Sequence, residues 1–412
     1  MFNHLAHPGI EASRQIPRAD SDARAHDLPG SQGRGSVATV EPVADRSRLE
    51  NAQNAAREAG VDALLVTPGP DLAYLTGYRA IALERLTCLV VPALGDPVLV
   101  APNLEVPAAQ ASPVGQLGVS IQGWAETDDP YVLVSKLASN ARAVALSDSM
   151  VAASVLRLRE AMPTAHQQLA GSVLRELRMI KSPAEIQHLR RAGRAIDRVH
   201  EQVPGLLWPG RTEQEVGEDI TEAILEAGHD TVDFIIVASG PNGASPHHEV
   251  SDRQIEVGDA VVVDIGGTMP SGYRSDSTRT YAIGFAPANF LAYYDVLQDA
   301  QRRAVECVRP GVTAESVDAA ARSVIADAGY GEHFIHRTGH GIGLETHEEP
   351  YIVQGNEEVL REGMAFSVEP GIYLPGEHGA RIEDIVVVTA DGVESLNNTP
   401  HELVVVDSAF SG

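Results

Sequence analysis

The segment V-V-V-D-I-G-G-T-M-P-S-G-Y-R-S-D-S-T-R-T-Y, residues 261–281, contains two aspartates, Asp264 and Asp276, on either side of the turn-forming residues T-M-P-S-G. Asp264 directly follows three valines, and such an apolar run is typical of a buried strand. A buried carboxylate costs free energy unless it is paired or bound to a metal ion. The segment therefore predicts a β-hairpin with two acidic side chains that need cationic partners.

Three later segments contain further candidate ligands. They are H-R-T-G-H-G-I-G-L-E-T-H-E-E-P (336–350) with His340, F-S-V-E-P-G-I-Y (366–373) with Glu369, and A-R-I-E-D-I-V-V-V-T (380–389) with Glu383. If all five side chains converge, the charge of four carboxylates is balanced by two divalent cations, and a bridging hydroxide is the natural fifth species. Without cations the carboxylates would repel one another, and some would take up protons.

An internal similarity supports this grouping. I-E-V-G-D-A-V-V-V-D-I-G (255–266) resembles L-R-E-G-M-A-F-S-V-E-P-G (360–371), and in both a glycine precedes the acid by six residues and another follows it by two. A second acid follows twelve residues later in the first copy and fourteen later in the second. We interpret the copies as two related β-hairpin units that each provide two oxygen ligands. The alternative is two unrelated buried hairpins with locally capped acids.

The order Asp, Asp, His, Glu, Glu within these motifs resembles the order of the corresponding residues in the pita-bread metallopeptidases. That group includes methionine aminopeptidase, Xaa-Pro aminopeptidase and Xaa-Pro dipeptidase (prolidase). The G-H-G-I-G-L-E-T-H-E-E-P-Y-I and E-P-G-I-Y motifs are the most specific. The resemblance covers residues 45–406 and is greatest to bacterial prolidase-type dipeptidases. The two aspartates are twelve residues apart, where many relatives have eleven, and the extra residue falls in a turn that tolerates insertion.

The resemblance implies an α+β fold with a C-terminal pita-bread catalytic domain. It also implies that two divalent metal ions per chain are bound by Asp264, Asp276, His340, Glu369 and Glu383. Oxygen ligands with one imidazole suit Mn²⁺, Co²⁺, Zn²⁺ or Fe²⁺, and we expect Mn²⁺. Two ions about 3.5–4 Å apart can share a hydroxide that attacks the scissile carbonyl carbon.

The resemblance assigns catalytic roles to three residues. Glu369 is expected to accept a proton as well as bind metal. His247, in S-P-H-H, matches a histidine that contacts substrate and relays protons, and His347, in E-T-H-E-E-P, matches one that stabilises the tetrahedral intermediate. A lone exposed histidine would ordinarily be a solvated surface group. We expect His248 to be a neighbour of the site rather than a participant.

Three further residues are candidates for substrate contact or for support of the ligands. His336 lies four residues before His340 and can line the same pocket. Arg381 can orient Glu383 or bind the substrate's terminal carboxylate, because a guanidinium group suits bidentate contact. Thr278, like Thr280, can donate a hydrogen bond to a carboxylate that binds metal. Alternatively, its hydroxyl can hydrogen-bond only to groups on the face of the sheet.

Composition limits the partners. The net charge of −26 disfavours nucleic acid and anionic membrane surfaces, which both need basic protein surface. No apolar run is long enough to cross a membrane, and no secretory signal is present, so we expect a cytoplasmic protein. The two cysteines, Cys88 and Cys307, form no spacing motif and are expected to be reduced thiols.

We divide the chain into three parts. Residues 1–44 are polar, rich in Gly and Ser and without periodicity, which predicts a disordered tail. Residues 45–165 alternate predicted strands, such as 63–66 and 143–146, with helices such as 45–60, which indicates a small α/β domain. This domain resembles the N-terminal domain of creatinase and the larger proline peptidases, which implies that it caps the active site and helps to form a homodimer.

Residues 166–412 form the third part. Amphipathic helices are predicted over 166–204, with a capping box at Ser182 and Glu185, and a second capping box at Thr212 begins a helix to about residue 227. The segment D-F-I-I-V-A-S-G-P-N-G-A-S-P-H-H (233–248) predicts a strand followed by a loop that presents the paired histidines. Helices at about 289–308 and 313–328 precede the last strands.

The expected activity is hydrolysis of Xaa-Pro bonds, which are tertiary amides without an N–H and therefore need a dedicated pocket. We favour an Xaa-Pro dipeptidase over an Xaa-Pro aminopeptidase that acts on longer peptides. A metal-free creatinase-type hydrolase would have other residues at the ligand positions. A non-catalytic pita-bread domain that binds protein or nucleic acid is disfavoured by the intact ligands and the acidic charge.

Overall fold

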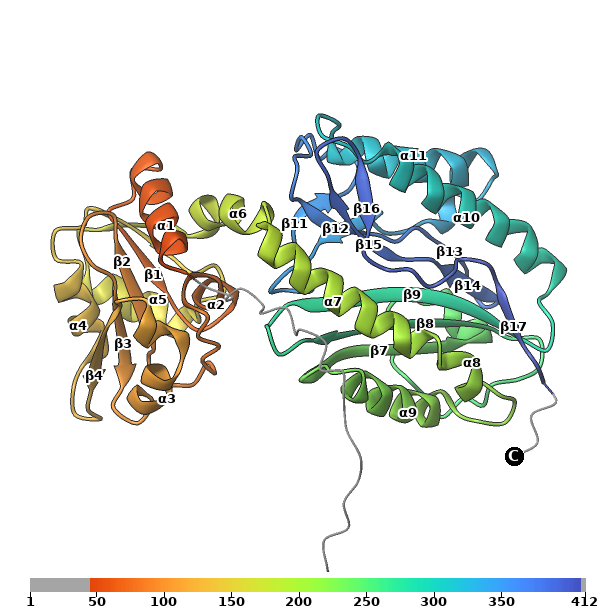
Figure 1. The fold of residues 1–412 in the computed structure, drawn as a ribbon, viewed down its shortest axis with the longest axis horizontal. Coiled ribbons are helices and arrows are strands. Elements are labelled where there is room, and N and C mark those ends of the chain that lie inside the picture. Colours follow the sequence, from red (N-terminus) through yellow and green to blue (C-terminus); the bar gives the residue numbers. More distant parts are fainter. Residues whose placement is uncertain (1–44, 409–412) are drawn as a thin grey trace, which may run out of the picture. The chain divides into compact units, whose positions relative to one another are not determined.

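The computed structural model describes residues 45–408 (Figure 1). The tail predicted for residues 1–44 lies outside the described residues. Over residues 45–408 the chain alternates helices with strands that form four sheets. No helix of the described part is both long and apolar enough to cross a bilayer.

A six-stranded mixed sheet occupies the first part of the described chain. Its strands are β1 (Ala63–Val66), β2 (Cys88–Pro92), β3 (Val98–Pro102), β4 (Ser120–Trp124), β5 (Ala143–Leu146) and β6 (His166–Leu169). The order is β4-β3-β2-β1-β5-β6, with β2 antiparallel to both of its neighbours and the other pairs parallel. The accompanying helices are α1 (Arg46–Glu58), α2 (Pro70–Thr76), α3 (Val106–Ala111), α4 (Pro130–Leu137) and α5 (Ala152–Ala161), with a 3₁₀ turn at Pro113–Gln116. The predicted α/β character of this region is confirmed.

The helix predicted from residue 166 is wrong at its start. His166–Leu169 form β6, which pairs in parallel with β5 at the edge of the first sheet. The sequence H-Q-Q-L lacks an apolar alternation, and its residues are exposed or half-buried, so only the pairing with β5 makes it a strand. The expected domain border at residue 165 therefore falls directly before the last strand of this sheet.

The helices that follow agree with the predicted capping residues. They are α6 (Gly171–Met179), α7 (Pro183–His200), α8 (Val203–Leu206) and α9 (Glu213–Glu226). Ser182 and Glu185 form a capping box at the start of α7, and Thr212 and Glu215 form one at the start of α9. Each box satisfies backbone N–H groups that the first turn of a helix leaves without partners.

The first ligand hairpin belongs to a four-stranded sheet in the order β17-β9-β8-β7. Its strands are β7 (Thr231–Ser239), β8 (Ala260–Thr268), β9 (Arg274–Ile283) and β17 (Val404–Val406). Helices α7 and α9 cover it with an apolar core that includes Ile196, Val199 and Ile220 (Figure 1). The loop between β7 and β8 begins with a 3₁₀ turn at Gly240–Ala244.

The three later predicted ligands lie on or directly beside strands of a five-stranded sheet in the order β11-β10-β12-β15-β16. Its strands are β10 (Gly339–Gly341), β11 (Glu348–Ile352), β12 (Ala365–Val368), β15 (Asp384–Val388) and β16 (Val393–Ser395), and β13 (Gly371–Leu374) pairs separately with β14 (His378–Arg381). Helices α10 (Ala288–Cys307) and α11 (Ala314–Asp327) cover these strands (Figure 1). The two sheets meet at a bridge between Thr278 and Glu383, where the Glu383 N–H donates to the Thr278 carbonyl at 3.1 Å.

Candidate metal centre

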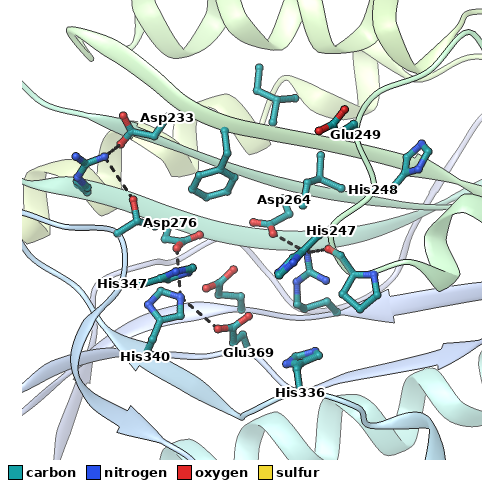
Figure 2. A pocket seen from close by; sticks show the side chains of 18 of the residues that line it. Asp233, His247, His248, Glu249, Asp264, Asp276, His336, His340, His347 and Glu369 are labelled. Atoms are coloured by element: carbon teal, nitrogen blue, oxygen red, sulfur yellow. Dashed lines mark hydrogen bonds and ion pairs between the residues drawn. The ribbon is translucent and has the colours of Figure 1, made fainter. Parts of the chain in front are cut away.

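The five predicted ligands converge on one cavity of about 800 Å³ (Figure 2). Asp264 lies on β8, Asp276 on β9 and His340 on β10, while Glu369 directly follows β12 and Glu383 directly precedes β15. In the β8–β9 hairpin, Asp264 pairs with Thr278 and Gly266 with Asp276, so the two aspartates point from the same face. Residues more than a hundred positions apart in the sequence are thereby brought to one point.

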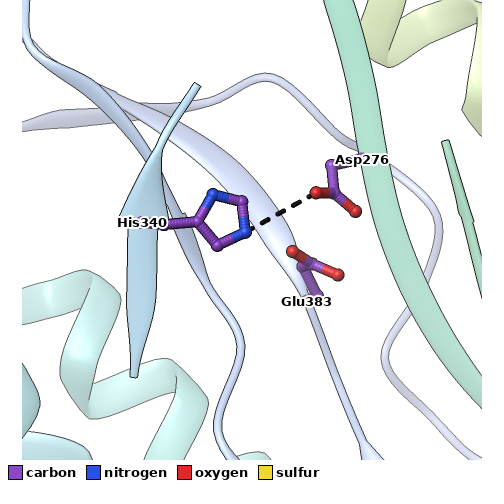
Figure 3. Close-up of side chains that lie close together, drawn as sticks. All are labelled: Asp276, His340 and Glu383. Carbon is purple, nitrogen blue, oxygen red and sulfur yellow. Dashed lines mark ion pairs between the residues drawn. The ribbon is translucent and has the colours of Figure 1, made fainter. Parts of the chain in front are cut away.

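Distances within the cavity are those of groups that can share a cation. His340 Nε2 lies 3.3 Å from Glu369 Oε1 and 3.6 Å from Asp276 Oδ2. One potential ligand atom from each of Asp276, His340 and Glu383 lies within 4.8 Å of the others. Figure 3 shows these three side chains pointing toward one another. All three side chains are buried.

The donor atoms fit divalent metal ions. Asp264 Oδ1 and Glu383 Oε1 are buried and have no hydrogen-bond partner among residues 45–408. A buried carboxylate oxygen without a donor is costly, and a cation removes that cost. Carboxylate oxygens with one imidazole are also the ligand types that the predicted metals accept.

Burial and like charge shift the pKa values of the ligands. Burial, followed by repulsion from the neighbouring carboxylates, raises the pKa of Asp276 and of Glu383 well above the ordinary range. Burial raises the pKa of Glu369 to about 7, with Asp264 adding to the shift. Burial and the nearby His347 lower the pKa of His340 to about 3, so its imidazole is neutral at physiological pH. The expectation that the metal-free acids hold protons agrees with these directions.

Arg381 contacts the carboxylate of Asp264 rather than that of Glu383, which it was expected to orient. Its Nη2 contacts Asp264 Oδ2 at 2.5 Å, its Nη1 donates to the Tyr373 hydroxyl at 2.7 Å, and its Nε donates to Thr278 Oγ1 at 3.2 Å. All three guanidinium nitrogens are therefore used within the protein. The hydrogen-bond path from Arg381 to Glu383 runs through Thr278, whose hydroxyl donates to Glu383 Oε2 at 2.7 Å, and the charge of Arg381 also acts on Glu383 directly.

Two supporting residues were missed by the sequence analysis. Ser367 Oγ donates to Glu369 Oε1 at 3.0 Å and accepts the His340 backbone N–H at 3.0 Å, so it joins two ligands. The spacing of Ser367 and Glu369, two residues apart along an extended segment, could have indicated a shared face. The Tyr373 hydroxyl links Arg381 to His336, whose Nε2 lies 2.9 Å away.

The predicted histidines also line the cavity (Figure 2). The rings of His347 and His340 are 4.0 Å apart between centroids and meet edge to face. Burial lowers the pKa of His347, and burial with the Arg381 charge lowers that of His336 to about 3. His247 is exposed to the cavity, whereas His248 pairs with Glu213 at 2.8 Å, as expected of a neighbour.

The remaining cavity wall was not predicted. Strand β7 contributes Phe234, Ile235 and Ile236, and an ion pair of 2.7 Å between Arg274 and Asp233 lies at another part of the wall. Arg337 also lines the cavity and stacks over the Tyr351 ring, 4.5 Å from its centroid. The positions of these wall residues depend on which face of β7 and of the 336–350 segment turns toward the predicted ligands.

Comparisons with known proteins agree with this geometry. Residues 187–390 match metallopeptidase family M24, and residues 48–180 match the creatinase/prolidase N-terminal domain. The chain is 57% identical over 360 residues to the probable dipeptidase PepE of Mycobacterium tuberculosis, covering 87% of this chain and 96% of the relative. It is 36% identical over 367 residues to an Xaa-Pro dipeptidase of Lactobacillus helveticus, covering 87% and 98%.

A solved structure shows the same fold. The crystal structure of dipeptidase PepE from Mycobacterium ulcerans superposes with a TM-score of 0.84 at 57% identity, covering 88% of this chain and 97% of that one. The predicted α+β, pita-bread architecture with a creatinase-like N-terminal domain is thereby confirmed. With both family models matched and relatives aligned along most of its length, the chain belongs to metallopeptidase family M24 and is a hydrolase.

Proposed function

We propose that this protein is an Xaa-Pro dipeptidase that uses two divalent metal ions held by Asp264, Asp276, His340, Glu369 and Glu383. The observation that carries the proposal is the convergence of these side chains, with two buried carboxylate oxygens that receive no hydrogen bond from the described part of the chain. The Xaa-Pro specificity is supported by the Lactobacillus helveticus relative, which is named an Xaa-Pro dipeptidase.

The residues of the cavity divide the work of hydrolysis. When bound, divalent cations polarise a carbonyl group and lower the pKa of coordinated water. We expect Glu369, a ligand that also lines the cavity, to take up a proton during the attack and to pass it on. His347 is neutral at physiological pH because its pKa is lowered, so it donates one N–H to the oxyanion. His247 contacts the substrate and relays the proton to the leaving proline nitrogen.

The apolar part of the cavity suits a small dipeptide. Phe234 and Ile236 are half-buried, lie on the same face of the sheet as Asp264 and leave apolar surface toward the cavity, whereas the Ile235 side chain packs into the core on the opposite face. A pyrrolidine ring or an apolar first residue that covers this surface gains free energy by leaving water. We propose that this wall and the ligands together select small Xaa-Pro substrates.

Hydrolysis of defined peptides tests the proposal. Ala-Pro, Gly-Pro and a longer Xaa-Pro peptide are incubated with the purified protein in the presence of Mn²⁺ and, separately, of a chelator. We expect metal-dependent release of proline from the dipeptides and slower cleavage of the longer peptide. Faster cleavage of the longer peptide would indicate an Xaa-Pro aminopeptidase, and no metal-dependent release from any of them would contradict the proposal.

Three associated properties belong to the same proposal. We propose Mn²⁺ as the physiological metal, a homodimer as the assembled state and the cytoplasm as the location. Metal analysis after purification without added metal, light scattering of the purified protein and cell fractionation test them in turn. A metal content near two ions per chain supports the dinuclear site.

A further inference from the structure

The loop that presents His247 is anchored by a carboxylate that lies outside the metal cavity. Glu213, the first residue of α9, is fully buried. Its Oε1 accepts the backbone N–H and the hydroxyl of Ser239, both at 2.7 Å, at the end of β7. Its Oε2 accepts the Ser251 hydroxyl at 2.6 Å and pairs with His248 Nε2 at 2.8 Å.

These contacts are spread along the whole loop. Asn242 Nδ2 donates to both oxygens of Glu213, at 3.0 and 3.1 Å, and so ties the 3₁₀ turn to the same carboxylate. The backbone N–H groups of Glu213 and Gln214 donate to the carbonyls of Arg253 and Ser251, at 3.1 and 3.0 Å. One carboxylate and the helix end that carries it therefore bind the start, the middle and the end of the loop.

His247 itself has no comparable anchor. Within residues 45–408, its imidazole makes no hydrogen bond to another protein group, although it faces the cavity. Figure 2 shows His247 beside the carboxylate ligands and His248 farther from them. The position of the His247 ring therefore depends on the backbone of its loop, which is held on one side by His248 and on the other by Arg381, whose Nη2 donates to the Pro246 carbonyl at 3.4 Å.

We propose that Glu213 is a positioning residue that holds His247 toward the substrate through its bond to His248. This inference rests on the proposed function, in which His247 contacts the substrate. The two adjacent histidines then have separate tasks: one faces the cavity, and the other fixes the loop to α9.

The chemistry of the anchor requires a carboxylate. An ionised carboxylate only accepts hydrogen bonds and has about four lone-pair positions, which suits a centre surrounded by donors. The positive end of the α9 dipole also favours negative charge at its first turn. A glutamine at 213 would turn an N–H₂ group toward donors of His248, Asn242 or Ser239, so the loop would lose part of its attachment while the volume stays the same.

A double-mutant cycle with hydrolysis of Ala-Pro tests the inference. In the wild-type background we expect Glu213→Gln to lower kcat/KM about tenfold to a hundredfold, because a small displacement of a reacting group is enough for such a loss. Metal content should stay at the wild-type level. In the His247→Ala background the same Glu213→Gln change should have an effect of at most about twofold, because the side chain that it positions is absent.

Glu185→Gln is the matched control. Glu185 is also a buried carboxylate in the first turn of a helix, where it accepts the Ser182 hydroxyl at 2.8 Å and the Tyr273 hydroxyl at 2.7 Å. Its replacement removes similar hydrogen bonds but not the anchor of the His247 loop. We expect its effect, whatever its size, to be equal in the wild-type and His247→Ala backgrounds.

Amide hydrogen exchange gives a readout that does not depend on activity. We expect residues 240–252 to exchange faster in Glu213→Gln, while α10 and α11 keep their protection. If Glu213→Gln fails to fold, His248→Phe replaces it in the double-mutant cycle with His247→Ala. This substitution removes one hydrogen-bond donor to Glu213 and keeps an aromatic ring of similar size.

Two results would overturn the inference: unchanged exchange in the loop, or an equal loss of kcat/KM with and without His247. If the wild-type protein hydrolyses no Xaa-Pro peptide, the proposed function fails, and the exchange experiment still decides whether Glu213 fixes the loop.

Discussion

At the scale of single residues, the site consists of buried charged groups, each of which costs free energy to bury unless it has a partner. Within the described residues, Asp264 and Glu383 each keep a buried oxygen without a hydrogen-bond donor, whereas Arg381 and Thr278 donate to the other oxygen. The protein therefore orients each carboxylate with one hydrogen bond and leaves one oxygen for another ligand. Second partners of this kind fix the direction of a metal ligand.

The raised pKa of Glu369 leads to a prediction for the metal-free protein. Its pKa is about 7 in the folded state against an ordinary value of 4.5, so the folded state binds the proton more tightly than the unfolded state. The resulting stabilisation is fully present below the ordinary value and is lost as the pH rises through 7. Because a metal needs the ionised carboxylate, we expect Mn²⁺ to raise the melting temperature more at about pH 8 than at about pH 5.5.

Calorimetry in buffers of different ionisation enthalpy directly measures the number of protons that are released when Mn²⁺ binds. Mn²⁺ binding should release protons near neutral pH, and Glu369→Gln should release about half a proton fewer per chain, because a group with a pKa of about 7 is half protonated there. Glu226→Gln, at an exposed position of α9, is the control and should release as many as the wild type. Equal proton release by the wild type and Glu369→Gln would show that Glu369 is already ionised before metal binds.

Two substitutions separate metal binding from turnover. Asp264→Asn should lower metal affinity by at least about tenfold and lower activity with it, because an anionic ligand is lost. His347→Ala should lower kcat by about a hundredfold while the metal content is unchanged, because it removes a hydrogen-bond donor beside the ligands. Metal analysis and steady-state kinetics on the same preparations check both. Full activity of His347→Ala would remove His347 from the mechanism.

At the scale of elements, the ligands are positioned by backbone pairing. The β8–β9 hairpin holds two of them, and β12 pairs with β15 so that Val368 lies opposite Asp384, next to the last two ligands. Strand β10 brings His340 to the same place, and it packs closely on β12. A Cβ atom added at Gly339 would lie 1.8 Å from the Ser367 carbonyl oxygen.

Gly339→Ala should therefore separate β10 from β12. We expect the free energy of unfolding to fall by about 1–3 kcal/mol, because the neighbouring atom belongs to the backbone and cannot rotate away. Urea denaturation of the metal-free protein measures it. Gly205→Ala is the control, since a Cβ there would meet nothing within 4 Å, and it should leave the unfolding midpoint nearly unchanged. A wild-type midpoint for Gly339→Ala would contradict the close approach of the two strands.

At the scale of the whole molecule, a shared core and a buried ion network join the N-terminal elements to the catalytic strands. Leu49 and Leu75 belong to the same apolar cluster as Tyr273, Ile342 and Ile385. In the network, Glu348 on β11 contacts Lys181 at 2.8 Å and Arg178 at 2.5 Å, and Arg178 also contacts Asp71 at 2.9 Å. The network lies one residue from His347, so it also fixes the strand that begins beside this histidine.

Glu348→Gln should strongly destabilise this arrangement. The Lys181 side chain is 1% exposed and that of Glu348 is 7% exposed, so the substitution leaves a buried ammonium group without its counter-charge. We expect a loss of about 3–5 kcal/mol in the free energy of unfolding, measured by urea denaturation. Replacing Lys181 by Met in the Glu348→Gln background should recover part of the loss, because it removes the unpaired charge.

An exposed ion pair provides the comparison. Arg46 and Glu50 lie 3.6 Å apart with side chains 52% and 62% exposed, and we expect Glu50→Gln to cost less than about 1 kcal/mol. Similar losses for Glu50→Gln and Glu348→Gln would show that the buried network contributes no more than a surface pair.

The sequence by itself determined which candidate ligands converge and in what order, the hairpin of the first pair and the capped starts of α7 and α9. These features are encoded locally, because an acid inside an apolar run, a short spacing or a capping box can be recognised without knowing what packs against it. The β6 strand could not be predicted, since H-Q-Q-L has no pattern of its own and becomes a strand only beside β5.

Only the tertiary structure decided which side chains support the ligands. Arg381 pairs with Asp264 across 117 positions of sequence, and Ser239, His248 and Ser251 meet at Glu213 across 26 to 38 positions. Such contacts depend on strand register and on which face of a loop turns inward, because a shift of one residue reverses every side chain of a strand. The sequence therefore predicted the chemistry of the site, and the packing of distant segments determined how that chemistry is oriented.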